Sequence, residues 1–198
     1  MGVSKPAVTR GDLERRIDQA MGRTRADLVI KNTRFLNVVT GEIAEGDIAV
    51  CGDVIVGTYE SYDGDIVIDG RDRIAVPGFI DTHIHFPQTF AGDAYGGGQL
   101  LEWLNLCMFP SESKFADPEF AAQAAVEFCD RRISAGTTAA MVFGSAFPHA
   151  QDALFTETQR RGLRIVSGRG IQTVGGDSAK PLITSEDEAI RLTRDEID

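Results

Sequence analysis

Two histidines at a spacing of two residues, His83 and His85, constrain this chain more than any other feature of its sequence. They lie in residues 76–89, which read Val-Pro-Gly-Phe-Ile-Asp-Thr-His-Ile-His-Phe-Pro-Gln-Thr. In a β-strand, residues i and i+2 point to the same face, and their Cα atoms lie roughly 6.6 Å apart. Two imidazoles placed in this way can bind one metal ion. The same alternation predicts that Asp81 shares their face and that Ile84 faces a layer of helices.

A bare His-x-His pair is a weak motif, because two half-buried polar residues near a strand end produce the same pattern. The surrounding residues make it specific. The segment Pro-Gly-Phe-Ile-Asp-Thr-His-Ile-His at 77–85 resembles the signature of the amidohydrolase superfamily, in which this pair ends the first strand of a metal-bearing (β/α)8 barrel. The resemblance implies that His83 and His85 are metal ligands. It also implies one Zn²⁺ ion per site as the cofactor, with another divalent metal as the alternative.

Further segments resemble guanine deaminases, in order and at compatible spacing. These are Phe-Pro-Gln-Thr at 86–89, Leu-Leu-Glu-Trp-Leu-Asn at 100–105, Phe-Pro at 109–110, Lys-Phe-Ala-Asp at 114–117 and Gly-Thr-Thr at 136–138. In that family the glutamine after the metal pair hydrogen-bonds the purine, and Gln88 holds the matching position. A carboxamide offers an acceptor and two donors, which suits the mixed edge of guanine. The alternative for Gln88 is a solvated loop residue after a proline.

The reaction implied by this resemblance is the zinc-dependent hydrolysis of guanine to xanthine and ammonia. Trp103 stays outside the predicted site, because leucines at helical spacing around it indicate core packing. The third histidine, His149, also stays outside, since the matching loop of bacterial guanine deaminases usually carries its histidine two positions earlier, where this chain has Phe147.

The region before the histidine pair predicts a small β-rich unit. Four runs rich in β-branched residues, separated by Gly, Asn and Asp, indicate strands joined by tight turns, at 26–32, 35–42, 47–50 and 54–57. Together with a preceding helix over 13–21, they resemble the N-terminal sandwich of amidohydrolases and are most similar to adenine deaminases. Adenine deaminase or another cyclic amidohydrolase is therefore the alternative function. The Phe-Pro-Gln after the histidine pair departs from the acidic, serine-rich segment of adenine deaminases, and function follows the site.

Beyond residue 89, helix and strand patterns alternate, as in the first units of a (β/α)8 barrel. The sequence predicts a loop over 91–98, helices over 117–134 and 152–161, strands over 137–143 and 163–167, and a helix that opens with a capping box at 185–188. The predicted fold class is α/β. Its segments are an N-terminal helix and linker over 1–25, a β-sandwich segment over 26–74, and the first three β/α units of an incomplete TIM barrel over 75–198.

The length of the chain does not allow a closed barrel. A (β/α)8 barrel needs about 250 residues, and fewer than half as many follow the predicted β-sandwich segment over 26–74. In guanine deaminases two further histidines, a metal-binding aspartate and a catalytic glutamate lie on later strands, so no catalytic residue is expected within residues 1–198. We expect the N-terminal part of a longer protein, inactive alone. A non-catalytic truncated remnant is the alternative from another functional class.

Composition limits the partners. The formal net charge of -10 argues against nucleic acid and anionic membrane surfaces, since both bind basic patches. Three cysteines without paired spacing fit a reducing compartment, and no apolar run approaches the length of a membrane span. We therefore expect a cytoplasmic protein whose partner is a small purine substrate, with a homodimer as the form considered for the full-length enzyme.

Overall fold

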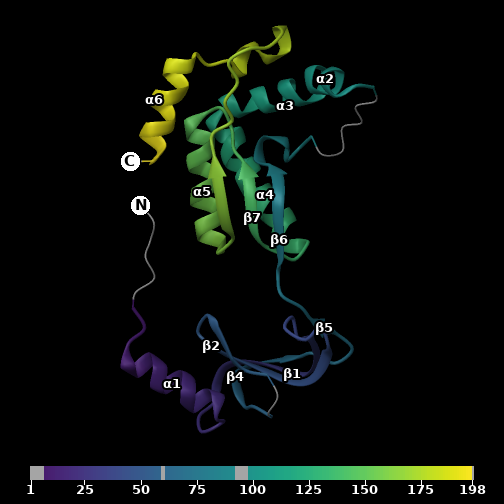
Figure 1. Cartoon of the computed structure of the whole chain (residues 1–198), viewed down its shortest axis with the longest axis vertical. Helices are drawn as coiled ribbons and strands as arrows, with labels where there is room; N and C mark the ends of the chain where they lie inside the picture. Colours follow the sequence, from purple (N-terminus) through teal and green to yellow (C-terminus); the bar gives the residue numbers. More distant parts are fainter. Residues whose placement is uncertain (1–6, 59–60, 92–97, 198) are drawn as a thin grey trace. The chain divides into compact units, whose positions relative to one another are not determined.

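The computed structural model describes residues 7–58, 61–91 and 98–197 (Figure 1). It divides into two compact units at Pro77 and Gly78. We call residues 7–77 the N-terminal unit and residues 78–197 the barrel unit. Most of the loop predicted over 91–98 lies outside the described residues.

The N-terminal unit begins with helix α1 (Arg10–Ala20), which opens with a capping box. Thr9 Oγ1 accepts a hydrogen bond from the Asp12 N–H at 3.1 Å, and the Asp12 carboxylate accepts one from the Thr9 N–H at 3.0 Å. The helix is followed by one sheet with the strand order β3-β2-β1-β4, in which β5 also pairs with β1. Its strands are β1 (Ala26–Leu36), β2 (Ile43–Cys51), β3 (Val54–Gly57), β4 (Gly64–Asp69) and β5 (Ile74–Ala75).

The first two predicted strands are wrong in one respect: residues 26–36 form a single strand, and the next strand begins only at Ile43. A register shift between Ile30 and Thr33 bends β1, and Asn32 there has a φ of 54°. The buried carboxylate of Asp47 holds this bend, accepting hydrogen bonds from the Asn32 N–H at 3.0 Å and from Lys31 Nζ at 2.8 Å. The Asn-Thr sequence thus marks a β-bulge within a strand rather than a turn between two strands.

The barrel unit is built on three parallel strands in the order β6-β7-β8, with a helix before each new strand (Figure 1). The repeating elements are β6 (Phe79–His85), α4 (Pro118–Ser134), β7 (Thr137–Phe143), α5 (Pro148–Arg161) and β8 (Arg164–Gly168). Between β6 and α4 lie the 3-10 helix η1 (Phe86–Gln88), helix α2 (Leu100–Trp103), the π-helix η2 (Leu104–Met108), helix α3 (Phe109–Ser113) and the 3-10 helix η3 (Lys114–Ala116). We call residues 100–113, from α2 to α3, the helical rod.

The sequence signals place α4 and β7 as predicted. Asp117 caps α4 by accepting a hydrogen bond from the Glu119 N–H at 2.9 Å, and Pro118 occupies the first helical position. The helix stops before Gly136, whose φ is 82°. Helix α5 begins four residues earlier than predicted, because Pro148, like Pro118 in α4, occupies the first helical position.

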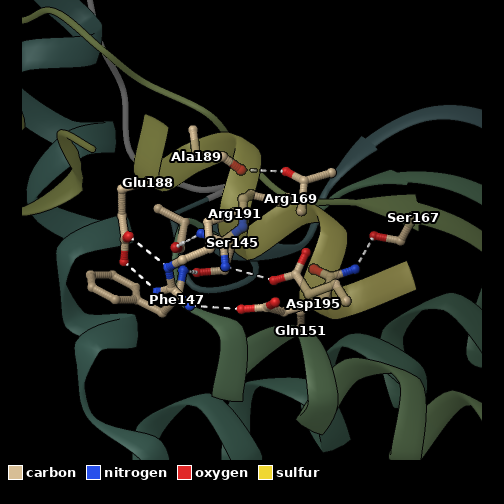
Figure 2. A network of polar contacts seen from close by, with 12 residues as sticks. Ser145, Phe147, Gln151, Ser167, Arg169, Glu188, Ala189, Arg191 and Asp195 are labelled. Carbon is tan, nitrogen blue, oxygen red and sulfur yellow. Dashed lines mark hydrogen bonds and ion pairs between the residues drawn. The ribbon is translucent and has the colours of Figure 1, made fainter. Parts of the chain in front are cut away.

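The segment after β8 is tied to its neighbours by polar contacts at the carboxyl ends of the strands (Figure 2). It contains the 3-10 helix η4 (Asp177–Leu182) and helix α6 (Glu186–Ile197). The buried side chain of Arg169 donates to the Ala146 carbonyl and, at 2.6 Å, to the Glu196 carboxylate. Gln151 of α5 donates to Ser167 Oγ at 2.7 Å. These bonds join the loop after β8 to the loop after β7 and to α6, and they join β8 itself to α5.

The core of the barrel unit fills the space between the sheet and helices α4 and α5. Ala140 and Val142 of β7 are buried against this layer, whereas Met141 and Phe143 on the other face are 55% and 52% exposed. Phe86, the first residue of η1, is fully buried, and its ring meets those of Phe115 and Phe128 edge-on. No helix within the described ranges is both long enough and apolar enough to cross a membrane.

We predict that Phe86→Leu destabilises the barrel unit by about 1–2 kcal/mol, because the smaller side chain leaves the edge-on ring contacts unfilled. Trp103 is the only tryptophan of the chain and lies in the barrel unit, so its fluorescence reports the unfolding of this unit in denaturant. Val126→Ala, at a side chain of α4 that is 41% exposed, is the control and should change the transition less. Equal shifts for the two variants would argue against Phe86 as an anchor of the segment that follows β6.

Candidate functional site

The histidine pair, His83 and His85, lies at the carboxyl end of β6, and its rings are close together. Their centroids are 5.3 Å apart and their planes are inclined by 60°. Phe143, the last residue of β7, stacks on His85 at 4.5 Å and lies 5.1 Å from His83. Both imidazoles therefore lie on the face of the sheet that is turned away from helices α4 and α5.

Asp81 does not share this face, so the alternation predicted for β6 is wrong at this point. Asp81 is opposite Ala140 and Ile84 is opposite Val142, so three steps along β6 match two along β7. Both partners in β7 are buried under the helices, and the Asp81 carboxylate accordingly lies 3.8 Å from Arg132 of α4. It also accepts a hydrogen bond from the His83 N–H at 3.1 Å. Asp81 therefore supports the backbone of His83 from the opposite side.

A hollow of about 650 Å³ opens beside β6, and we call it the site hollow. Its volume lies within the range of small-molecule sites. The histidine pair and Gln88 all line it, so the structure brings the three predicted site residues together. The remaining lining residues are Ile84, Thr89, Leu100, Trp103, Leu104, Phe128, Arg131 and Arg132.

Trp103 and Arg131 are lining residues that the sequence reasoning missed. Trp103 is half-buried and contributes to the wall of the site hollow, although its leucine-rich helix indicated core packing. Arg131 of α4 donates to the Thr89 carbonyl at 2.9 Å and so fixes the turn after Gln88. The helical pattern of the sequence shows which residues share a helix face, but it does not show that this face borders a hollow.

The surroundings of His85 favour its neutral, metal-binding form. Burial, and to a smaller extent the neighbouring His83, lower the pKa of His85. Neutral imidazole is the form that binds metal ions. Two imidazoles that share one tetrahedral zinc ion have ring centroids about 5 Å apart, given Zn–N bonds of about 2.0–2.1 Å. The observed spacing of 5.3 Å fits this arrangement.

The described residues place no third metal-ligating side chain beside the histidine pair. Within residues 7–58, 61–91 and 98–197, no group of three or more His, Cys, Asp or Glu side chains is arranged to hold a metal ion. His149 does not extend the pair: its Nε2 atom lies 2.8 Å from the Phe115 carbonyl oxygen, and the residue does not line the site hollow. The assignment of His83 and His85 as metal ligands stays a prediction.

Gln88 has a partner that the sequence did not indicate. Its Nε2 atom donates a hydrogen bond to Oε1 of Glu112, at 3.1 Å, across 24 positions of the chain. Burial raises the pKa of Glu112, and the hydrogen bond from Gln88 acts in the opposite direction. Glu112 follows the Phe-Pro pair at 109–110, but only the folded helical rod brings it to Gln88.

Three comparisons with known proteins show what this chain is similar to. The profile of the amidohydrolase family matches residues 74–197. The guanine deaminase of Escherichia coli is 39% identical over 127 residues, which are 64% of this chain and 29% of that protein. The adenine deaminase of Methylobacterium nodulans is 60% identical over 74 residues, which are 37% of this chain and 13% of that protein.

The crystal structure of the guanine deaminase from Bradyrhizobium japonicum matches with a TM-score of 0.71 and 30% identity, over 86% of this chain and 40% of that one. The predicted fold class, α/β with the first units of an incomplete TIM barrel, is confirmed, as is the resemblance to both deaminases. The chain spans less than half of the length of each of these relatives.

Proposed function

The chain belongs to the amidohydrolase family, and we propose that it supplies the histidine pair and the substrate-binding glutamine of a zinc-dependent guanine deaminase. The observation that carries this proposal is the convergence of His83, His85 and Gln88 on one hollow at the carboxyl end of a barrel strand. Carboxyl ends of parallel barrel strands are where such folds place their active sites. Because the chain spans less than half of its relatives, we propose the activity for a full-length protein in which further strands complete the barrel.

In this proposal His83 and His85 hold the metal, and members of the family are generally metal-dependent. A bound zinc ion would supply hydroxide at neutral pH by lowering the pKa of its water to about 7. The ring of Phe143, stacked on His85, and the hydrogen bond from the His83 N–H to Asp81 hold the two histidines in place. The proposed overall reaction is guanine plus water to xanthine plus ammonia.

The remaining site residues bind and orient the base. Gln88 offers hydrogen bonds to the purine edge, and the half-buried ring of Trp103 provides an apolar wall. The group that transfers the proton is proposed to lie on a later strand, outside residues 1–198. The three cysteines of the chain are free thiols, which fits the reducing cytoplasm proposed for the enzyme.

Guanine is the preferred substrate in this proposal because the match to the guanine deaminase is the longer one and extends into the barrel unit. The 127 residues that match the E. coli guanine deaminase include at least 50 residues beyond Pro77, in the unit that contains the site. Adenine is the second candidate, because the match to adenine deaminase has the higher identity, 60%. Turnover of both bases by the full-length protein separates them. We expect xanthine from guanine and little hypoxanthine from adenine, and the reverse preference would overturn the guanine proposal.

We predict that Gln88→Ala weakens guanine binding by about 1–3 kcal/mol and leaves the zinc content unchanged, because the purine loses its polar partner in a partly desolvated site. The change is measured as a rise in KM or Kd for guanine in the full-length protein. Gln123→Ala, at an exposed position of α4, is the matched control. Parent-like guanine binding by the Gln88→Ala protein would exclude this residue as the purine contact.

A further inference from the structure

The hydrogen bond between Gln88 and Glu112 assigns a role to a residue that is not itself among those lining the site hollow. We infer that Glu112 is a positioning residue, which fixes the carboxamide of Gln88 so that its Oε1 atom is free to accept a hydrogen bond from the substrate. This inference rests on the proposed function, since it assumes that Gln88 contacts the base. It goes further by naming the group that sets the orientation of that contact.

The backbone around Gln88 is already held, so the freedom that remains is in its side chain. Phe86 and Pro87 are buried, and Thr89 Oγ1 donates to the Phe86 carbonyl at 2.7 Å. Arg131 closes the same turn by donating to the Thr89 carbonyl at 2.9 Å. With the backbone held, the Gln88 carboxamide can still take two orientations, in which its oxygen and its NH2 group exchange places. The partner of the side chain selects between them.

The carboxylate of Glu112 discriminates between these two orientations. In its ionised form this carboxylate only accepts hydrogen bonds, so it pairs with the Nε2 group of Gln88 and repels the Oε1 atom, and that hydrogen bond opposes the rise in the pKa of Glu112 that burial causes. One N–H of Gln88 is used by Glu112, and the carbonyl oxygen and the second N–H stay available. Guanine carries two adjacent donors, at N1 and at its 2-amino group, whereas adenine carries one donor, its 6-amino group, beside the acceptor N1. A fixed acceptor at Gln88 therefore meets more donors on the guanine edge.

The π-helix η2 explains how Glu112 comes to face Gln88. One extra residue in the helical path turns all later side chains back by about 100° relative to an uninterrupted α-helix. Without it, Glu112 would lie about 180° around the axis from Trp103; with it, Glu112 lies about 80° away, near the direction of Leu104. Trp103 and Leu104 both line the site hollow. The π-helix thus turns Glu112 to the side of the helical rod that borders the site.

The test is a double-mutant cycle in the full-length enzyme. We expect Glu112→Ala to raise KM for guanine about tenfold, the usual effect of one hydrogen bond, and to leave kcat within about twofold. In a Gln88→Ala background, Glu112→Ala should change KM by less than about twofold, because a residue that acts only through Gln88 has nothing left to position. An equal effect of Glu112→Ala in both backgrounds would overturn the inference, since it would show a role independent of Gln88.

Two further variants separate orientation from charge. Glu112→Gln keeps an acceptor but adds a donor, so it tolerates both orientations of Gln88 and should give a smaller rise in KM than Glu112→Ala. Glu119→Gln removes an exposed carboxylate at the start of α4 and should leave KM unchanged. A rise in KM for Glu119→Gln as large as that for Glu112→Gln would indicate a general effect of charge and would contradict the inference.

A measurement that does not depend on turnover tests the positioning role of Glu112 separately from the proposed function. In protein labelled with ¹⁵N at glutamine side chains, the Gln88 resonances are those that Gln88→Ala removes. We expect Glu112→Ala to shift them and Glu119→Gln to leave them in place. Unshifted resonances together with guanine turnover would overturn the positioning role alone. Shifted resonances in a protein that deaminates no purine would uphold the positioning of Gln88 and overturn the proposed function.

Discussion

Replacing either His83 or His85 with Ala is expected to lower guanine turnover by the full-length enzyme by about a thousandfold or more. Each change removes one imidazole from a metal whose chemistry supplies several kcal/mol of transition-state stabilisation. The same variants should lose most of their bound zinc, because few protein ligands hold a catalytic zinc ion. Zinc is measured per protomer by elemental analysis of the purified proteins, alongside the steady-state rate.

Thr82→Ala is the control for these variants, since Thr82 lies between the two histidines and does not line the site hollow. It should keep the zinc content of the parent and most of its turnover. A His83→Ala protein with as much zinc as the parent would contradict the assignment of the histidine pair as metal ligands.

Residues 1–198 alone are expected to release no ammonia from guanine. The described part of the chain offers two imidazoles and no larger cluster of metal-ligating side chains, so zinc affinity should fall far below that of a complete site. The sheet of the barrel unit also ends at β6 and β8, each paired with one neighbour. Unpaired strand edges favour association, so we expect this chain to be poorly soluble in isolation.

The measurement is an ammonia-release assay on the purified, monodisperse chain, with the full-length protein as the positive control. Turnover by the chain alone would contradict this prediction. It would mean that a second copy supplies the missing strands and ligands, and the mass of the active species in solution would then have to correspond to a dimer.

The sequence predicts most accurately the elements whose ends carry their own signals. Helix α4 has a capping aspartate and a proline at its start and a glycine just after its end, and all three can be seen without a structure. The shared face of His83 and His85 agrees with the prediction from their spacing, since residues two apart in a regular strand point the same way, although the register shift of β6 turns Asp81 to the other face. The signals at the ends of α4 are local, so neighbouring elements do not change them.

Features that depend on a neighbouring element could not be predicted. Asp81 faces Arg132 because β6 carries a bulge against β7, and the register between two strands is not visible in either one. The approach of Glu112 to Gln88 depends on the π-helix in the helical rod, which no residue pattern of the sequence indicated. The register between β6 and β7 and the π-helix in the helical rod therefore determine the two features of the site that the sequence does not predict. These are the direction of Asp81 and the approach of Glu112 to Gln88.

The removal and return of zinc tests the central claim most directly, namely that this segment belongs to a metal-dependent guanine deaminase. The full-length protein is stripped with a chelator, and the conversion of guanine to xanthine and ammonia is followed as zinc is added back. We expect turnover to disappear with the metal and to return in proportion to zinc, up to about one ion per site. Undiminished conversion by protein that elemental analysis shows to be free of metal would contradict the account.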